Sequence, residues 1–153
     1  MNALELRIPP LALVLLTAVL MGLLAWAAPS LAWHWPYRSV VALTLVLAGS
    51  SVAVLGVAAF RQARTTVNPT KPQAASSLVH SGIYRVSRNP MYLGFLIVLL
   101  ALAVFLSNLL SLVLVPLFVV YMNRFQIGPE ERALQALFGQ EFTAYSRKVR
   151  RWL

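Results

Sequence analysis

The residues best suited to chemistry lie in one polar segment, residues 81–94, and in an acidic pair at Glu130 and Glu131. The segment reads Ser-Gly-Ile-Tyr-Arg-Val-Ser-Arg-Asn-Pro-Met-Tyr-Leu-Gly and runs directly into an apolar block. Its glycines allow a ligand to approach the backbone, and free N–H groups at the helix start marked by Pro90 could hold an anionic group. A capped membrane helix without a ligand would show the same spacing, so spacing alone leaves both interpretations open.

The acidic pair also has two interpretations. Glu130 and Glu131 could pair with a cationic ligand, or they could simply follow Pro129 into the first turn of a helix, where the helix dipole favours negative charge. The sequence contains no G-x-S-x-G, H-E-x-x-H or P-loop pattern. It has no cysteine, and its two histidines, His34 and His80, are far apart, so we predict no metal site.

The elements that must position these residues are apolar. Of the 153 residues, 59% are hydrophobic and 11% are charged, whereas a soluble domain carries about 25% charged residues. We therefore predict a single integral membrane domain over residues 1–153. The net charge of +9 could indicate a nucleic-acid ligand, but the basic residues flank the apolar blocks. That pattern is typical of cytoplasmic membrane loops and anionic lipid headgroups, so no nucleic-acid partner is predicted.

The apolar blocks predict an all-α fold with four transmembrane helices. The third apolar region, residues 91–122, would be about 48 Å long as one helix, much longer than the ~30 Å hydrocarbon core of a bilayer. Ser107 and Asn108 offer a turn in its middle, which favours a short hairpin. The predicted helices are about 11–28, 40–60, 91–106 and 109–123. The first block could instead be a signal peptide, but its weakly basic start favours a retained helix.

The basic residues also predict the orientation. The linker over residues 61–90 and the tail after Met122 carry 11 of the 13 lysines and arginines. Four helices with both termini in the cytoplasm put linker and tail on the cytoplasmic side, as the positive-inside rule favours. Hydrophobic periodicity predicts a further cytoplasmic or interfacial helix over about 129–150.

Three groups of residues together resemble the integral membrane methyltransferases, which include isoprenylcysteine carboxyl methyltransferase and the phospholipid N-methyltransferases. They are Leu-Val-x-Ser-Gly-Ile-Tyr at 78–84, Arg-Asn-Pro-Met-Tyr-Leu-Gly at 88–94, and Glu130-Glu131 followed by Leu134, Phe138-Gly139 and Tyr145. The resemblance covers roughly residues 60–152, and it is to bacterial members of the family, which implies a location in the inner membrane of a bacterium. Asn89 stands where the eukaryotic enzymes have a histidine, and Phe142 stands where the family has a second tail tyrosine.

The resemblance implies methyl transfer from S-adenosyl-L-methionine at the cytoplasmic membrane face. It assigns cofactor binding to Leu78, Val79, Gly82, Tyr84, Arg88, Asn89, Tyr92, Glu130 and Glu131. It implies catalytic roles for Arg124, which would face the acceptor, and for Glu130. Asn89 can donate a hydrogen bond but cannot take up a proton near neutral pH, unlike the histidine it replaces.

The acceptor is left open by the sequence. A lipophilic or small molecule taken from the bilayer is expected, with an isoprenylcysteine-like carboxylate as the first candidate. A phospholipid amine and a small thiol are alternatives. An alternative that is not an enzyme is a small membrane scaffold whose basic linker binds anionic lipid, because such a protein would have the same composition.

Overall fold

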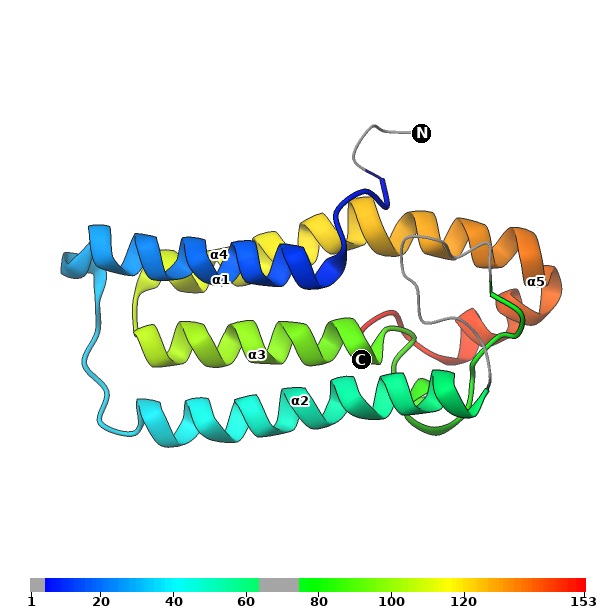
Figure 1. Cartoon of the computed structure of the whole chain (residues 1–153), viewed down its shortest axis with the longest axis horizontal. Helices are drawn as coiled ribbons and strands as arrows, with labels where there is room; N and C mark the ends of the chain where they lie inside the picture. The colour runs from blue at the N-terminus through cyan, green and yellow to red at the C-terminus, as the bar shows by residue number, and fades with distance from the viewer. Residues whose placement is uncertain (1–4, 64–74) are drawn as a thin grey trace.

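The structure is a computed structural model that describes residues 5–63 and 75–153, so residues 64–74 of the predicted linker lie outside the described part. Regular structure in the described ranges is helical, apart from a single bridge between Ala32 and Asn108. Figure 1 shows the arrangement. The elements are α1 (Pro10–Ala27), η1 (Pro29–Leu31), α2 (Arg38–Gln62), η3 (Gly82–Arg85), α3 (Pro90–Leu106), α4 (Leu109–Tyr121), η4 (Met122–Ile127) and α5 (Gly128–Lys148).

The predicted all-α class is confirmed, and the four apolar helices begin and end within two residues of their predicted bounds. Proline sets the starts of α1 and α3, at Pro10 and Pro90, where its missing N–H costs nothing. At the turn between α3 and α4, Ser107 adopts a left-handed conformation and the Asn108 side chain accepts the N–H groups of Leu110 and Ser111. Those bonds cap the start of α4.

The C-terminal helix α5 begins at Gly128, one residue from its predicted start, but it is continuous with the helix before it. The chain stays helical from α4 through η4, a π-helix, into α5, without the predicted break between residues 123 and 129. Pro129 has no N–H to donate to the carbonyl of Phe125, four residues earlier. That carbonyl accepts the backbone N–H of Leu6 at 3.0 Å instead, so the N-terminal segment provides the bond that proline cannot.

In the described part of the chain, three helical segments are long and apolar enough to cross a membrane by length and composition, namely Pro10–Ala27, Arg38–Gln62 and the continuous helix Leu109–Lys148. Within the last of these, α4 is apolar whereas α5 carries the charged residues, so we treat α5 as lying outside the bilayer. The shorter helix α3 is also apolar. Large apolar side chains such as Leu16, Val40 and Val54 are exposed on α1 and α2, as expected of faces that contact lipid.

Helix α3 lies at the centre of the bundle, between α2 on one side and the pair α1 and α4 on the other (Figure 1). The buried core contains Met21 of α1, Leu99 of α3, Phe118 of α4 and Met122 of η4. Helix α2 packs on α3 through two glycines, Gly49 and Gly94, whose backbones are in close contact. Small residues at such a crossing let two membrane helices approach closely.

We expect Gly94→Ala to loosen the packing of α2 on α3. A Cβ atom at Gly94 would lie 2.5 Å from the carbonyl oxygen of Gly49 and 2.8 Å from the Cβ of Ala53, and neither atom is the flexible end of a side chain. Overpacking of this kind costs about 1–3 kcal/mol, which should lower the melting temperature of the detergent-solubilised protein by several degrees. Gly22→Ala is the control, because a Cβ at Gly22 meets nothing within 4 Å. Equal melting temperatures for the two variants would contradict this packing.

Both terminal segments reach the same end of the bundle, at the start of α5. Arg132 of α5 forms an ion pair with Glu5 at 2.8 Å, and the indole N–H of Trp152 donates to Asn123 at 3.1 Å. Gly139 breaks the helical geometry inside α5 with a φ of 49°. The chain reverses there and returns towards the start of α3 (Figure 1), which brings the C-terminal residues to the polar segment 81–94.

Candidate functional site

A cluster of polar side chains lies where the start of α3 meets η4 and α5. At its centre, the hydroxyl of Tyr92 donates to Oε1 of Glu130 at 2.5 Å. The side-chain amide of Gln126 donates to the same oxygen at 2.5 Å and to the Tyr92 hydroxyl at 3.4 Å. Gln126 and Tyr92 are both buried. Tyr92 and Gln126 thus fix one oxygen of the Glu130 carboxylate.

The other oxygen of Glu130, Oε2, accepts no hydrogen bond from the part of the chain that the structure describes. Burial raises the pKa of the Glu130 carboxyl to about 7, and the negative charge of neighbouring Glu131 adds to the rise. The bonds from Tyr92 and Gln126 act in the opposite direction and do not compensate. Glu130 is therefore a half-buried acid with one free oxygen, which a cationic ligand would stabilise in its charged form.

The second acid is held by two arginines. Oε1 of Glu131 accepts Nη2 of Arg88 at 2.9 Å and Nε of Arg151 at 3.1 Å, while Oε2 accepts Nη2 of Arg151 at 2.5 Å. Arg151 and Glu131 therefore form a bidentate ion pair with two parallel hydrogen bonds, which is both stronger and more restricted in geometry than a pair with one bond. With both oxygens engaged, Glu131 differs from Glu130, whose second oxygen is free.

Arg88 joins the segment before α3 to α5. Its Nη1 donates to the carbonyl of Ser146 at 3.0 Å and its Nη2 to Glu131, whereas its Nε is buried without a partner. An unpaired buried donor costs about 1–3 kcal/mol, which an acceptor group on a ligand would relieve. Two of the three guanidinium nitrogens of Arg88 are thus bonded within the protein, and its Nε is left for an acceptor on a ligand.

Asn89 holds the C-terminal segment. Its Nδ2 donates to the carbonyl of Arg151 at 2.9 Å, and its backbone N–H donates to the hydroxyl of Ser87 at 3.1 Å. The Ser87 hydroxyl in turn lies 3.4 Å from the same Arg151 carbonyl. The asparagine amide thus has a partner that needs only a hydrogen-bond donor, so the proton transfer available to a histidine is not required for this contact.

The remaining predicted cofactor residues lie on the segment that leads into α3. Val79 and Tyr84 are buried against Ala59 near the end of α2, Leu78 is half-buried, and Gly82 is exposed with a φ of 58° that favours glycine. Burial raises the pKa of the Tyr84 hydroxyl, and the charge of Glu130 contributes to that rise. The carbonyl of Tyr84 accepts the hydroxyl of Tyr145 at 2.8 Å, which ties this segment to the returning half of α5.

Arg124 is the predicted site residue that the structure does not bring into the cluster. Its side chain is exposed on η4 and makes no hydrogen bond or ion pair with the other predicted site residues that the structure describes. Gln126, two positions further on, points towards Glu130 instead. Sequence reasoning missed Gln126 because it ended one helix at 123 and began the next at 129. A continuous helix puts residues 126 and 130 on one face, four positions apart.

The arrangement can bind a small molecule that carries both a cation and an anion. Glu130 offers a free carboxylate oxygen, and Arg88 offers an unpaired buried donor. Tyr84 and Tyr92 add buried aromatic surface beside the acid. These features fit S-adenosylmethionine, whose sulfonium, amino and carboxylate groups need partners of these kinds. The predicted cofactor residues Arg88, Asn89, Tyr92, Glu130 and Glu131 are thus brought together by direct contacts or shared partners.

Fold and site together define an integral membrane protein with a buried acidic site at one end of its helical bundle. Residues 37–141 match the family model described as phospholipid methyltransferase. The chain belongs to that family, which confirms the resemblance seen in its motifs.

Curated relatives extend this comparison. A probable protein-S-isoprenylcysteine O-methyltransferase of Oryza sativa subsp. indica is 33% identical over 121 residues, which are 79% of this chain and 63% of the relative. Protein-S-isoprenylcysteine O-methyltransferase B of Arabidopsis thaliana is 29% identical over 124 residues, 79% of this chain and 61% of the relative. An uncharacterized protein of Haemophilus influenzae is 46% identical over 63 residues, which are 41% of this chain and all of the relative. No solved structure matches the chain significantly.

The match to the plant enzymes is partial. The chain spans 63% of the length of the rice relative and 61% of the Arabidopsis one. What those proteins methylate is therefore a starting point for a proposal about this chain.

Proposed function

We propose that the protein transfers a methyl group from S-adenosylmethionine, at the cytoplasmic membrane face, to a lipophilic or small acceptor. The observation that carries the proposal is the half-buried Glu130, held through one oxygen by Tyr92 and Gln126 with the other oxygen free, in a chain of this family. The cofactor supplies the methyl group on a sulfonium. The protein's part is to bind, orient and exclude water, and methyl transfer by this cofactor needs no metal.

In this proposal, Glu130 pairs with a cationic group of the cofactor and Arg88 with its carboxylate. Tyr84, Tyr92 and Asn89 line the pocket, and Leu78, Val79 and Gly82 offer backbone contacts. Glu131 has an indirect role, because its ion pairs with Arg88 and Arg151 hold these two side chains in place beside the pocket. Arg124 keeps its proposed role towards the acceptor, with an exposed side chain that is available to a molecule arriving from outside the cluster.

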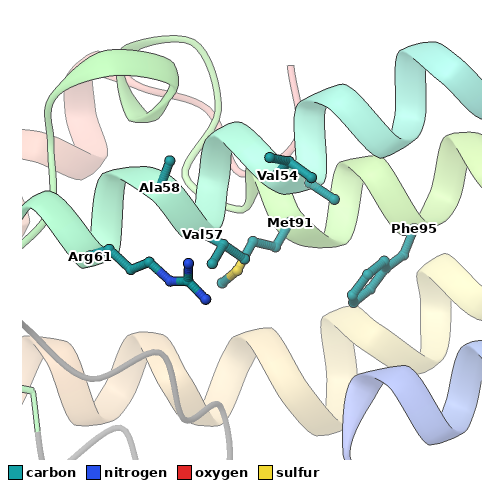
Figure 2. A pocket seen from close by; sticks show the side chains of 7 residues that line it. Val54, Val57, Ala58, Arg61, Met91 and Phe95 are labelled. Carbon is teal, nitrogen blue, oxygen red and sulfur yellow. The ribbon is translucent and has the colours of Figure 1, made fainter.

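An apolar groove beside the site supports a lipophilic acceptor. Its volume is about 340 Å³, and it is lined by α2 and α3, with Val57, Met91 and Phe95 among its walls. Figure 2 shows Arg61 at one end of the lining and Phe95 at the other. Met91 and Phe95 flank Tyr92 in sequence, and the rings of Tyr92 and Phe95 lie 6.4 Å apart. The groove is therefore next to the residue that holds Glu130.

The charge in this groove favours an acidic acceptor. Among the residues that the structure describes, Arg61 alone contributes a charge to the lining, so a carboxylate is better matched there than an amine. A carboxylate acceptor also needs no base to remove a proton. We therefore propose an isoprenylcysteine-like carboxylate as the acceptor class, in line with the named activity of the plant relatives.

A phospholipid amine is the second candidate, and the description of the matching family as phospholipid methyltransferase favours it. An amine nucleophile needs a base, and Glu130, with a pKa of about 7, could accept a proton near neutral pH. Incubation with methyl-labelled S-adenosylmethionine separates the candidates. Label in a farnesylcysteine analogue that is released by mild alkali supports the carboxylate, because a methyl ester is hydrolysed there. Label in phosphatidylethanolamine that is stable to alkali supports the amine.

Filling the groove should lower methylation of the acceptor and leave binding of the cofactor unchanged. We expect Ala58→Phe, which puts a ring into the groove, to lower methylation of a long-chain acceptor about tenfold. The loss corresponds to about two methylene groups no longer buried, at ~0.8 kcal/mol each. Leu55→Phe is the control, because Leu55 is exposed and outside the groove lining. Methylation assays together with S-adenosylhomocysteine binding check this, and an Ala58→Phe variant with undiminished methylation would exclude the groove as the acceptor site.

The contacts of the two terminal segments support a membrane topology for the protein. We propose four membrane crossings with both termini in the cytoplasm and, for a bacterial chain, insertion in the inner membrane. Glu5 and Trp152 both contact the end of the bundle that carries the site, which is what an even number of crossings requires. Single cysteines at Ser30, between α1 and α2, and at Ser81, which are both exposed positions, should react with impermeant reagents from opposite sides of the membrane. Reaction from one side would contradict this topology.

A further inference from the structure

The last residues of the chain are built into the candidate site. The basic run at residues 147–151 suggests contact with lipid headgroups, and Arg147, Lys148 and Arg150 are indeed exposed. Arg151 differs from them because its guanidinium makes the two-bond ion pair with Glu131. Sequence pattern does not distinguish Arg150 from Arg151, and only the fold separates them.

The backbone of this segment is bound as firmly as the side chain of Arg151. The carbonyl of Arg150 accepts the N–H of Arg88 at 3.0 Å, and the carbonyl of Arg151 accepts Nδ2 of Asn89 at 2.9 Å. Trp152 packs against the hydrophobic core and donates its indole N–H to Asn123. The C-terminal segment, residues 149–152, therefore bridges the start of α3, η4 and α5.

These contacts satisfy the polar groups of the turn that precedes α3. Arg88 and Asn89 both lie in the segment singled out for cofactor binding, and each of them bonds to the C-terminal segment. Glu131 is likewise held between Arg88 and Arg151. The free oxygen of Glu130 has no such partner from the C-terminal segment, so the segment leaves the acid of the site open.

We propose that the C-terminal segment forms a wall of the cofactor site and that Arg151 is a positioning residue that acts through Glu131. The inference rests on the proposed function, because it concerns how the chain prepares itself for the cofactor. Arg151 holds Glu131, Glu131 holds Arg88, and Arg88 keeps its unpaired Nε in the site. Without Arg151, the carboxylate and Arg88 lose their fixed geometry, and the cofactor must order them when it binds.

A C-terminal segment that blocked the cofactor site would have the opposite effect on cofactor affinity. If Arg151 occupied the place of the cofactor's cation, its removal would free Glu131 and strengthen binding. The contacts favour a wall, because Arg88, Asn89 and Asn123 bond to three successive residues of the segment and fix it to the protein on both sides of Glu131.

The test measures binding of S-adenosylhomocysteine, by calorimetry and by thermal shift, to full-length protein in detergent. We expect Arg151→Gln to weaken binding about tenfold. Arg151→Lys, which keeps the charge with a single nitrogen, should recover part of the loss. Arg150→Gln is the matched control: it removes the same charge one residue away from an exposed side chain and leaves the Arg150 carbonyl in place. It should bind as the unsubstituted protein does.

A double-mutant cycle separates positioning from general stability. If Arg151 acts through Glu131, Arg151→Gln should have little further effect on affinity in a Glu131→Gln background. Additive losses, unchanged binding or tighter binding in Arg151→Gln would each overturn the inference and leave the proposed function standing. If Arg151→Gln fails to fold, full affinity in Arg151→Lys overturns the inference and partial loss supports it. Absence of binding by the unsubstituted, folded protein would overturn the proposed function as well.

Discussion

Glu130→Gln should weaken the binding of S-adenosylmethionine by about tenfold or more, without destabilising the protein. Glutamine keeps the oxygen that accepts the bonds from Tyr92 and Gln126, so the local packing is retained. It removes the charge that the proposal pairs with a cation of the cofactor. A hydrogen bond to a charged group contributes about 1.5–3 kcal/mol, which corresponds to roughly a 10- to 100-fold change in affinity.

The stability of the unliganded variant makes this expectation more specific. A buried carboxylate with an open oxygen is costly, so the neutral glutamine should match or exceed the melting temperature of the unsubstituted protein near pH 8. Glu141→Gln is the control, because Glu141 is exposed on α5 and its substitution removes the same charge away from the site. Weaker cofactor binding together with an equal or higher melting temperature would show that Glu130 serves ligand binding and does not stabilise the fold. Unchanged affinity would return Glu130 to a purely structural role at the start of α5.

Cofactor affinity should depend on pH with a midpoint near 7. The pKa of Glu130 is about 7, so the carboxyl is mostly protonated at pH 6 and mostly ionised at pH 8. Its ionised fraction rises about tenfold over that range, and affinity for a cationic ligand should rise by a similar factor. Titration of binding at fixed ionic strength checks this. Glu130→Gln should flatten the profile, and an equally steep profile in that variant would assign the pH dependence to another group.

The unliganded protein should respond to pH in the opposite sense. The folded-state pKa of Glu130 lies above its usual value of 4.5, so between these values the folded protein binds more protons at this site than the unfolded one. The contribution of Glu130 to stability is therefore complete below about pH 4.5 and is lost as the pH rises through 7. As the pH rises through 7, we therefore expect the stability of the unliganded protein to fall and the cofactor affinity to rise, because both depend on the ionisation of Glu130.

The sequence predicted the helices because their signals are local. Long apolar runs bounded by Pro10, by Pro90 and by the Ser107-Asn108 turn leave few alternative bounds, and the structure follows them closely. The region of the candidate site was also predictable, since its residues fall in motifs with a fixed order. Gly139 could be read as an interruption of the last helix, and it is the point at which the chain reverses.

The contacts that organise the site were not predictable from local signals. Gln126 was missed because Pro129 suggests a helix start, and nothing nearby indicates that Leu6 would satisfy the Phe125 carbonyl left open by the proline. Arg151 was assigned to headgroups because its partner, Glu131, lies 20 residues earlier and beyond the reversal at Gly139. Both features depend on packing between segments far apart in the chain.

The structure also divides the acidic pair that the sequence treats as one unit. Glu130 keeps an oxygen for a ligand, whereas both oxygens of Glu131 are bound by arginines. We therefore expect Glu130 to contact the cofactor directly and Glu131 to shape the pocket around it.

Binding of S-adenosylhomocysteine to the purified, detergent-solubilised protein is the sharpest test of the cofactor assignment. We predict a rise in melting temperature that saturates with ligand concentration, accompanied by measurable heat of binding, and a smaller rise in Glu130→Gln at the same concentration. Adenosine at matched concentration should give a smaller rise, because it lacks the amino and carboxylate groups. A folded protein whose melting temperature does not move at millimolar S-adenosylhomocysteine would contradict the assignment of this cluster as a cofactor site.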